Sequence, residues 1–193
     1  MRVRLRQFIR IYRRVLIFLA VIFFVAIFVV TYGGFYPVAV VNGDWILARH
    51  FRTHLAAAKE YETSTTGTST VSSVLKGSDL TVSVLDGLIE EVLIERGARS
   101  EFGDRFEPLR AERVGHFMDQ SAVISAEAKR YGLNSQQFEK EIVIPQVTRD
   151  LLSGRLFLKP IRLEDWLTAQ KRSPSVAIFS KIFHWNGEQV TVQ

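Results

Sequence analysis

The sequence contains no cysteine and, before Asp44, no acidic residue. The missing thiols exclude a disulfide framework, a Cys-ligated zinc site, a thiol nucleophile and a lipid anchor on cysteine. They do not identify a compartment, because extracytoplasmic proteins need not use disulfides. The sequence also lacks a nucleophile elbow, a phosphate-binding loop and a dinucleotide fingerprint. No catalytic residue and no cofactor are therefore predicted.

The net charge of +5 arises at one end of the chain. Six of the 25 basic residues precede the long apolar run, and the charges of the remaining 19 are almost balanced by 20 acidic residues. The body of the protein is thus close to neutral, and its composition does not predict a nucleic-acid partner. The six residues are Arg2, Arg4, Arg6, Arg10, Arg13 and Arg14.

A membrane helix is predicted over residues 15–35. Residues 15–30 carry no polar side chain, and about 20 apolar residues suffice to span a bilayer core. The arginines of residues 1–14 predict a cytoplasmic N-terminus and a domain on the far side. A cleaved signal peptide is the alternative, but its apolar region is usually shorter and Thr31-Tyr32-Gly33 is a poor cleavage site. A buried helix of a soluble protein is the other alternative, but such a helix would not have six arginines clustered before its N-terminal end.

Beyond the membrane, the sequence predicts a mainly α-helical domain over 36–175, with short β elements at its start and in a β-hairpin at 176–193. A β-prone run at 38–41 precedes Asn42-Gly43, the preferred pair for a type I′ turn, and a helix over 48–62. The Ser/Thr/Gly-rich residues 63–78 predict a mobile loop. A polar extension of the helix is the alternative there.

Four further helices are expected. Asp79 is expected to cap a helix that runs to about residue 100. A third helix from about Pro108 to 131 would end at Gly132 as a left-handed cap. Asn134 would cap a fourth helix, which Pro145 should kink or end early. A short helix follows over about 163–167, and the final hairpin would turn at Asn186-Gly187.

The order of these features resembles the N-terminal domain of the SurA/PrsA/PpiD group of extracytoplasmic chaperones. The matching pieces are Val40-Val41-Asn42-Gly43-Asp44-Trp45-Ile46, Leu85-Asp86-Gly87-Leu88-Ile89 with its helix, and Ala128-Lys129-Arg130-Tyr131-Gly132-Leu133-Asn134 with Phe138. The likeness covers about 38–172. It implies a chaperone of the bacterial inner membrane that contacts the lipid bilayer and binds unfolded or nascent polypeptides.

The same family commonly continues into a parvulin prolyl-isomerase domain. Residues 176–183 resemble the first strand of that domain, with Lys181 where the family has its active-site histidine. Only 18 residues remain from Val176, far fewer than such a domain needs. The resemblance therefore argues against isomerase activity and leaves open a degenerate stub or a truncated sequence. A foldase without its catalytic domain and a non-catalytic membrane scaffold remain alternatives.

Apolar side chains are the candidate polypeptide-binding residues, because a groove that accepts many sequences gains its affinity from apolar burial. The candidates are Phe51, Leu55, Phe117, Met118 and Phe138. Each of them is also compatible with an ordinary core. His50 and His54, four residues apart on a predicted helix, would share a face, but no third histidine is near in sequence. No metal site is predicted.

Overall fold

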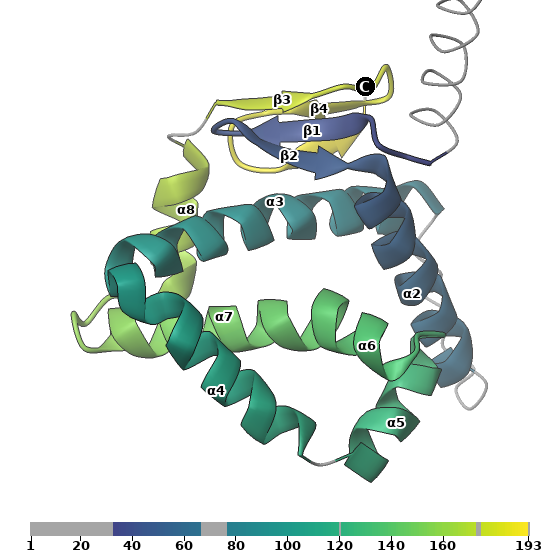
Figure 1. Cartoon of the computed structure of the whole chain (residues 1–193). Coiled ribbons are helices and arrows are strands. Elements are labelled where there is room, and N and C mark those ends of the chain that lie inside the picture. Colours follow the sequence, from purple (N-terminus) through teal and green to yellow (C-terminus); the bar gives the residue numbers. More distant parts are fainter. Residues whose placement is uncertain (1–32, 67–76, 120, 173–174, 193) are drawn as a thin grey trace, which may run out of the picture.

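The structure is a computed structural model that describes residues 33–66, 77–119, 121–172 and 175–192 (Figure 1). The described chain is mainly helical with short strands, as predicted. Its elements, in order, are β1 (Pro37–Val41), β2 (Asp44–Leu47), α2 (Ala48–Thr66), α3 (Gly77–Phe102), the 3₁₀ turn η1 (Gly103–Arg105), α4 (Phe106–Met118), α5 (Ser121–Arg130), α6 (Ser135–Phe138), the π-helical turn η2 (Glu139–Val143), α7 (Ile144–Phe157), α8 (Leu163–Arg172), β3 (Val176–Ile178), β4 (Phe183–Trp185) and β5 (Val190–Val192).

The predicted membrane helix at 15–35 lies outside the described residues except for its last three, 33–35, which are not helical. Among the helices that the structure does describe, none has the length and apolar character required to cross a membrane.

The β-sheet joins the two ends of the described chain. β1 lies between β2 and β3 and pairs antiparallel with both. Asn42 and Gly43 connect β1 to β2 with φ values of 51° and 94°, and positive values at both positions fit the predicted type I′ turn. Figure 1 shows the strands lying along α3.

The predicted C-terminal hairpin is correct only in its second half. β4 and β5 pair around Asn186-Gly187, and the Asn186 side chain accepts hydrogen bonds from the backbone N–H groups of Glu188 and Gln189. β3 does not pair with either strand but completes the first sheet against β1. The apolar run at 176–178 thus covers an edge that β1 would otherwise expose.

The long helix α3 carries the main hydrophobic core. Leu85, Leu88, Ile89 and Leu93 are buried, as their helical spacing indicates. The strands, α7 and α8 pack on this stripe through a set of buried side chains: Ala39, Val41, Ile46, Leu152, Leu156, Leu163, Leu167 and Val190.

Two helix boundaries near the Ser/Thr-rich segment differ from prediction. α2 continues to Thr66, so the loop expected from residue 63 is wrong there and the polar helix extension holds. The hydroxyls of Thr63 and Ser64 donate to backbone carbonyls of Lys59 and Tyr61, which accommodates these polar side chains within a helix. α3 begins at Gly77, so Asp79 lies in its first turn rather than at its cap. Residues 67–76 lie outside the described part of the chain.

A second, smaller core holds the other helices together. It contains Val114, Ile124, Ala128, Phe138, Val143 and Val147. The single helix expected from Pro108 to 131 is wrong, because α4 ends at Met118 and α5 begins at Ser121. Asp and Ser compete for backbone hydrogen bonds and favour helix ends, which accounts for a break at Asp119–Ser121.

The turn between α5 and α6 follows the predicted chemistry. Gly132 has φ 65°, and the N–H groups of Gly132 and Leu133 donate to the carbonyls of Lys129 and Ala128, the two bonds of a Schellman cap. Asn134 and Gln137 form the expected capping box at the start of α6.

Pro145 produces a π turn rather than a sharp kink. Proline lacks an N–H to donate to the carbonyl of Glu141, and its ring clashes with that carbonyl in a regular α-helix. The chain widens over Glu139–Val143, where the Ile144 N–H donates to the Glu139 carbonyl in the i→i−5 pattern of a π-helix. α6, η2 and α7 therefore follow one another without a loop, and η2 turns Glu141 into the buried side of the helix.

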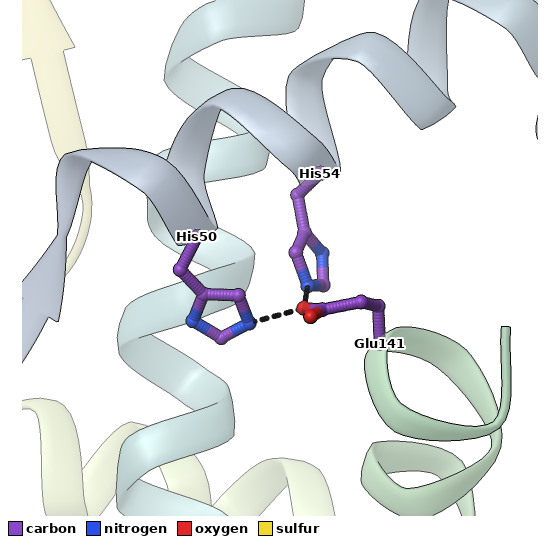
Figure 2. A group of neighbouring side chains, drawn as sticks. All are labelled: His50, His54 and Glu141. Carbon is purple, nitrogen blue, oxygen red and sulfur yellow. Dashed lines mark hydrogen bonds and ion pairs between the residues drawn. The ribbon is translucent and has the colours of Figure 1, made fainter. Parts of the chain in front are cut away.

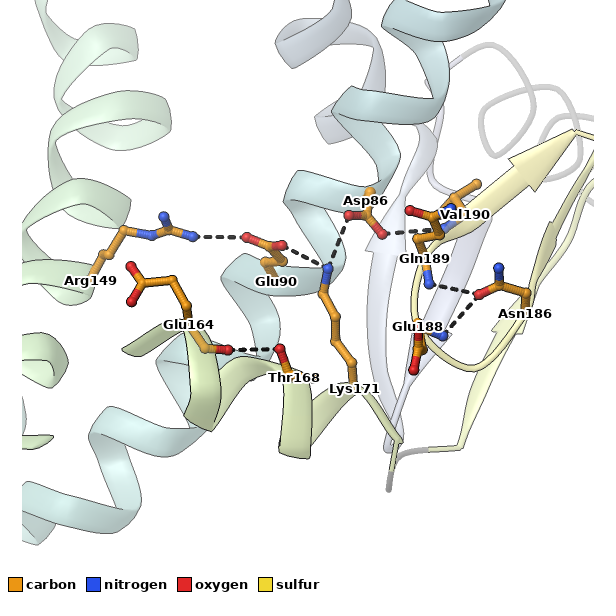
Figure 3. A network of polar contacts seen from close by, with 10 residues as sticks. All are labelled: Asp86, Glu90, Arg149, Glu164, Thr168, Lys171, Asn186, Glu188, Gln189 and Val190. Atoms are coloured by element: carbon orange, nitrogen blue, oxygen red, sulfur yellow. Dashed lines mark hydrogen bonds and ion pairs between the residues drawn. The ribbon is translucent and has the colours of Figure 1, made fainter. Parts of the chain in front are cut away.

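A partly buried polar network fastens α8 and the final hairpin to α3 (Figure 3). Lys171 Nζ lies 2.7 Å from Glu90 Oε1 and 3.1 Å from Asp86 Oδ2. Asp86 also accepts the backbone N–H of Val190 at 3.2 Å, and Glu90 accepts from Arg149 of α7 at 2.8 Å. One charged cluster thus contacts α3, α7, α8 and β5.

Candidate functional site

The five apolar residues predicted to bind polypeptides do not gather around one cavity. Phe138 is buried in the second core, and Phe51 is half-buried against the main core. Leu55 is half-buried on α2, and Met118 packs against the second core. Met118 also lines a hollow of about 360 Å³ beside α4, and Phe117, with 45% of its surface exposed, lines a larger one.

That hollow, the α4–α7 groove, has a volume of about 600 Å³. Its apolar wall consists of Phe117 of α4, Phe102 of α3, and Val147, Leu151 and Leu158 along and just beyond α7. Leu158 is 73% exposed, and its neighbour Phe157 is more exposed still. The α7 contribution was not predicted from the sequence, because Val147 and Leu151 have the spacing of a core stripe.

Charged groups of both signs border the groove. Arg113 and His116 come from α4, and Asp150 and Arg155 come from α7. Arg155 Nε lies 3.6 Å from Glu101 Oε2, which is too long for a hydrogen bond. Lys159 instead donates to both Glu101 oxygens, and this bond holds the pKa of Glu101 below its ordinary value. The rim therefore offers hydrogen-bond donors from two arginines and an acceptor from Asp150.

A second candidate site lies on α2, where His50 and His54 converge on one carboxylate oxygen (Figure 2). His50 Nε2 is 2.7 Å and His54 Nε2 is 3.1 Å from Glu141 Oε2. The two rings meet edge to face with centroids 4.6 Å apart. We call these three residues the His50–His54–Glu141 cluster.

Local geometry explains the cluster. Residues four apart on a helix stand on the same face, so α2 presents both imidazoles together, as the sequence predicts. The partner was missed because Glu141 is 87 residues away from His54. The sequence feature near Glu141 that indicates its inward position is Pro145, four residues later. A proline at that spacing favours the π turn that points Glu141 inward.

The cluster changes the pKa values of two carboxyl groups, Glu141 within it and Glu91 beside it. Burial alone would raise the pKa of Glu141, but the contacts of His50 and His54 outweigh burial and hold that pKa far below its usual range. Glu91 of α3 lies within electrostatic reach of the same three residues. Burial raises the pKa of Glu91, and the two histidines oppose that rise.

Comparison of the chain with protein-family models, with curated proteins and with solved structures finds no match in any of the three.

Proposed function

We propose that the protein is a membrane-anchored extracytoplasmic chaperone that binds unfolded or nascent polypeptides in the α4–α7 groove. The observation that carries the proposal is the exposure of Phe117 and Leu158 in the lining of one largely apolar hollow. Single exposed apolar residues are ordinary on a protein surface, whereas apolar residues gathered at a concave site are typical of binding surfaces.

Such a groove suits clients of many sequences. Covering one exposed Leu or Phe side chain contributes about 2 kcal/mol without a directional requirement. The guanidinium groups of Arg113 and Arg155 and the carboxylate of Asp150 can bond to the peptide groups of any extended chain. Two or three apolar contacts correspond to a weak affinity, roughly millimolar to micromolar, which permits repeated release.

The apolar run at 15–35 and its arginine flank support the placement of the groove outside the membrane, near emerging chains. Tethering would raise the local concentration of the groove for such clients without any new contact. The likeness of residues 38–172 to SurA/PrsA/PpiD-type chaperones supports the same function.

The test is suppression of client aggregation by the full chain in lipid vesicles. Light scattering of several unrelated, chemically denatured proteins should decrease when the full chain is present at equal concentration. The Phe117→Ser and Leu158→Ser substitutions together should abolish most of that effect. Phe179→Ser is the matched control, because Phe179 is 60% exposed but lies between β3 and β4, away from the groove.

Two outcomes would reject the proposal. Undiminished suppression by the groove variant would place client binding elsewhere, and no suppression of any client would favour a scaffold with one dedicated partner.

The isomerase alternative has its own assay, because acceleration of proline-limited refolding beyond the spontaneous rate would require a catalytic site. Lys181, between β3 and β4, cannot act through the imidazole chemistry that the family resemblance would require at that position.

A further inference from the structure

We propose that the His50–His54–Glu141 cluster is a binding site for one divalent transition-metal ion, Zn²⁺ in particular, which links α2 to the π turn η2. This inference does not depend on the chaperone proposal, because the cluster shares no residue with the α4–α7 groove.

The donor set is the first argument. Two imidazole nitrogens and one carboxylate oxygen are ligands that Zn²⁺ takes readily, with water in a fourth position. Ca²⁺ and Mg²⁺ prefer sites made of oxygen ligands, so two histidines disfavour them. Within the part of the chain that the structure describes, this is the group of three ligating side chains whose donor atoms converge, all within 4.8 Å of one another.

The distances are the second argument. His50 Nε2 and His54 Nε2 already point at the same Glu141 oxygen, at 2.7 and 3.1 Å. In a tetrahedral zinc site, ligand atoms stand about 3.3 Å apart around an ion that is about 2.0–2.2 Å from each. To bind an ion, the carboxylate has to withdraw from the two nitrogens, and the imidazole rings, whose ligating atoms lie within 4.8 Å of each other and of the carboxylate, have to close on the ion by small side-chain rotations. Each imidazole would bind the ion through Nε2 in its neutral form with the proton on Nδ1, and any further proton would be released to water on binding.

Burial and neighbouring charge are the third argument. The side chains of Glu141, His54 and His50 are 10%, 17% and 35% exposed, so the site is enclosed by protein but can be reached past His50. Glu91 adds a second acid in electrostatic reach. Lys140 opposes a cation, with its Nζ 3.4 Å from Glu141 Oε1, but its side chain is mostly exposed and can turn into solvent.

The bound ion is expected to link two parts of the fold. α2 follows directly from the sheet and packs through Phe51 on the main core, whereas η2 contributes Val143 to the second core. A shared ion would hold these two parts together more firmly than hydrogen bonds to the same carboxylate do. Metal binding to the folded state stabilises it by mass action.

The experiment uses the full chain, purified in detergent with an affinity tag that contains no histidine and freed of metal by chelation. Equilibrium dialysis against micromolar Zn²⁺ should give one bound ion per chain, whereas Mg²⁺ and Ca²⁺ should not bind. A hundredfold excess of Zn²⁺ over the dissociation constant should raise the unfolding temperature by about 5–10 °C. X-ray absorption on the zinc-loaded chain should report two imidazole ligands.

Variants identify the ligands. Glu141→Gln keeps the size of the side chain, and it should weaken Zn²⁺ binding at least tenfold, as should His54→Ala. His116→Ala is the matched control, because His116 lies on α4 at the groove and should leave the bound zinc unchanged. Absence of stoichiometric zinc in the unmutated chain, or equal binding by Glu141→Gln and the unmutated chain, would overturn the proposal. The X-ray absorption result on the unmutated chain decides the question even where a variant fails to fold.

Discussion

Lys171 stands between two carboxylates of α3, Glu90 and Asp86 (Figure 3). Removal of its charge by Lys171→Met would leave the partly buried Asp86 without its cation, and Glu90 with Arg149 alone. We expect the free energy of unfolding to decrease by about 2–3 kcal/mol, because breaking a largely buried ion pair uncovers unpaired charge. Urea denaturation measures the change. Arg172→Met is the control, since Arg172 and Glu188 are both exposed and such pairs contribute at most about 1 kcal/mol.

The same lysine gives a pH signature. Burial lowers its pKa, but the hydrogen bonds to Glu90 and Asp86 outweigh burial, and the pKa of Lys171 is raised above its ordinary value. A raised folded-state pKa means that the stabilisation is fully present below the unfolded value, about 10.4, and is lost as pH rises through the folded value. The stability difference between the unmutated chain and Lys171→Met should therefore be constant near neutral pH and narrow above about pH 10.5. A difference that stays constant into strong alkali would contradict this account.

At the scale of one element, α3 contains two glycines that the same substitution should affect in opposite directions. A Cβ at Gly87 would meet nothing within 4 Å, whereas a Cβ at Gly97 would overlap the indole ring of Trp166. Gly87→Ala should stabilise the fold by about 0.5–1 kcal/mol, because alanine loses less backbone freedom in a helix. Gly97→Ala should destabilise it by about 1–3 kcal/mol through overpacking against α8.

Thermal unfolding of both α3 variants measures this contrast. Equal shifts in the same direction would mean that α8 does not pack on α3 through Trp166. The single helix α3 thus has two kinds of surface, one open at Gly87 and one closed at Gly97.

At the scale of the whole molecule, the features that were predicted correctly from the sequence are those determined by residues close together in the chain. The turn at Asn42-Gly43, the cap at Gly132 and the capping box of Asn134 with Gln137 depend on side chains within a few residues of each other, and the structure contains all three. The stripe of α3 was likewise readable from its helical period. Each of these features depends only on residues a few positions apart, so all the residues that determine it can be seen together in one short stretch of sequence.

The features that were missed require contacts between distant segments. β3 pairs with β1 because an open strand edge was available there, which no residue near Val176 reveals. Glu141 reaches His50 and His54 only after α2 and η2 have packed together. The α4–α7 groove is lined by residues of the same two helices that share the second core through Val114 and Val147, and only the packed structure separates the two sets. Local pattern cannot separate an occupied apolar face from an open one.

The last strands raise the question of whether residues 176–193 are an appendage or part of one cooperative unit. Val190 is 2% exposed in the main core, whereas Val192, two residues later on the same strand, is 46% exposed. Val190→Asp would bury a charge beside Asp86, which accepts the Val190 N–H. We expect a loss of more than about 3 kcal/mol for Val190→Asp and less than about 1 kcal/mol for Val192→Asp.

Hydrogen exchange distinguishes the two possibilities. If β5 belongs to the cooperative unit, Val190→Asp should reduce protection along α3, including amides far from the substitution, because α3 carries the core on which the strand packs. A detachable hairpin would instead lose its own protection while α3 kept that of the unmutated chain. In that case the sheet of β1, β2 and β3 would have to be stable without β5, and the β4–β5 hairpin would be a separate module added to a complete domain.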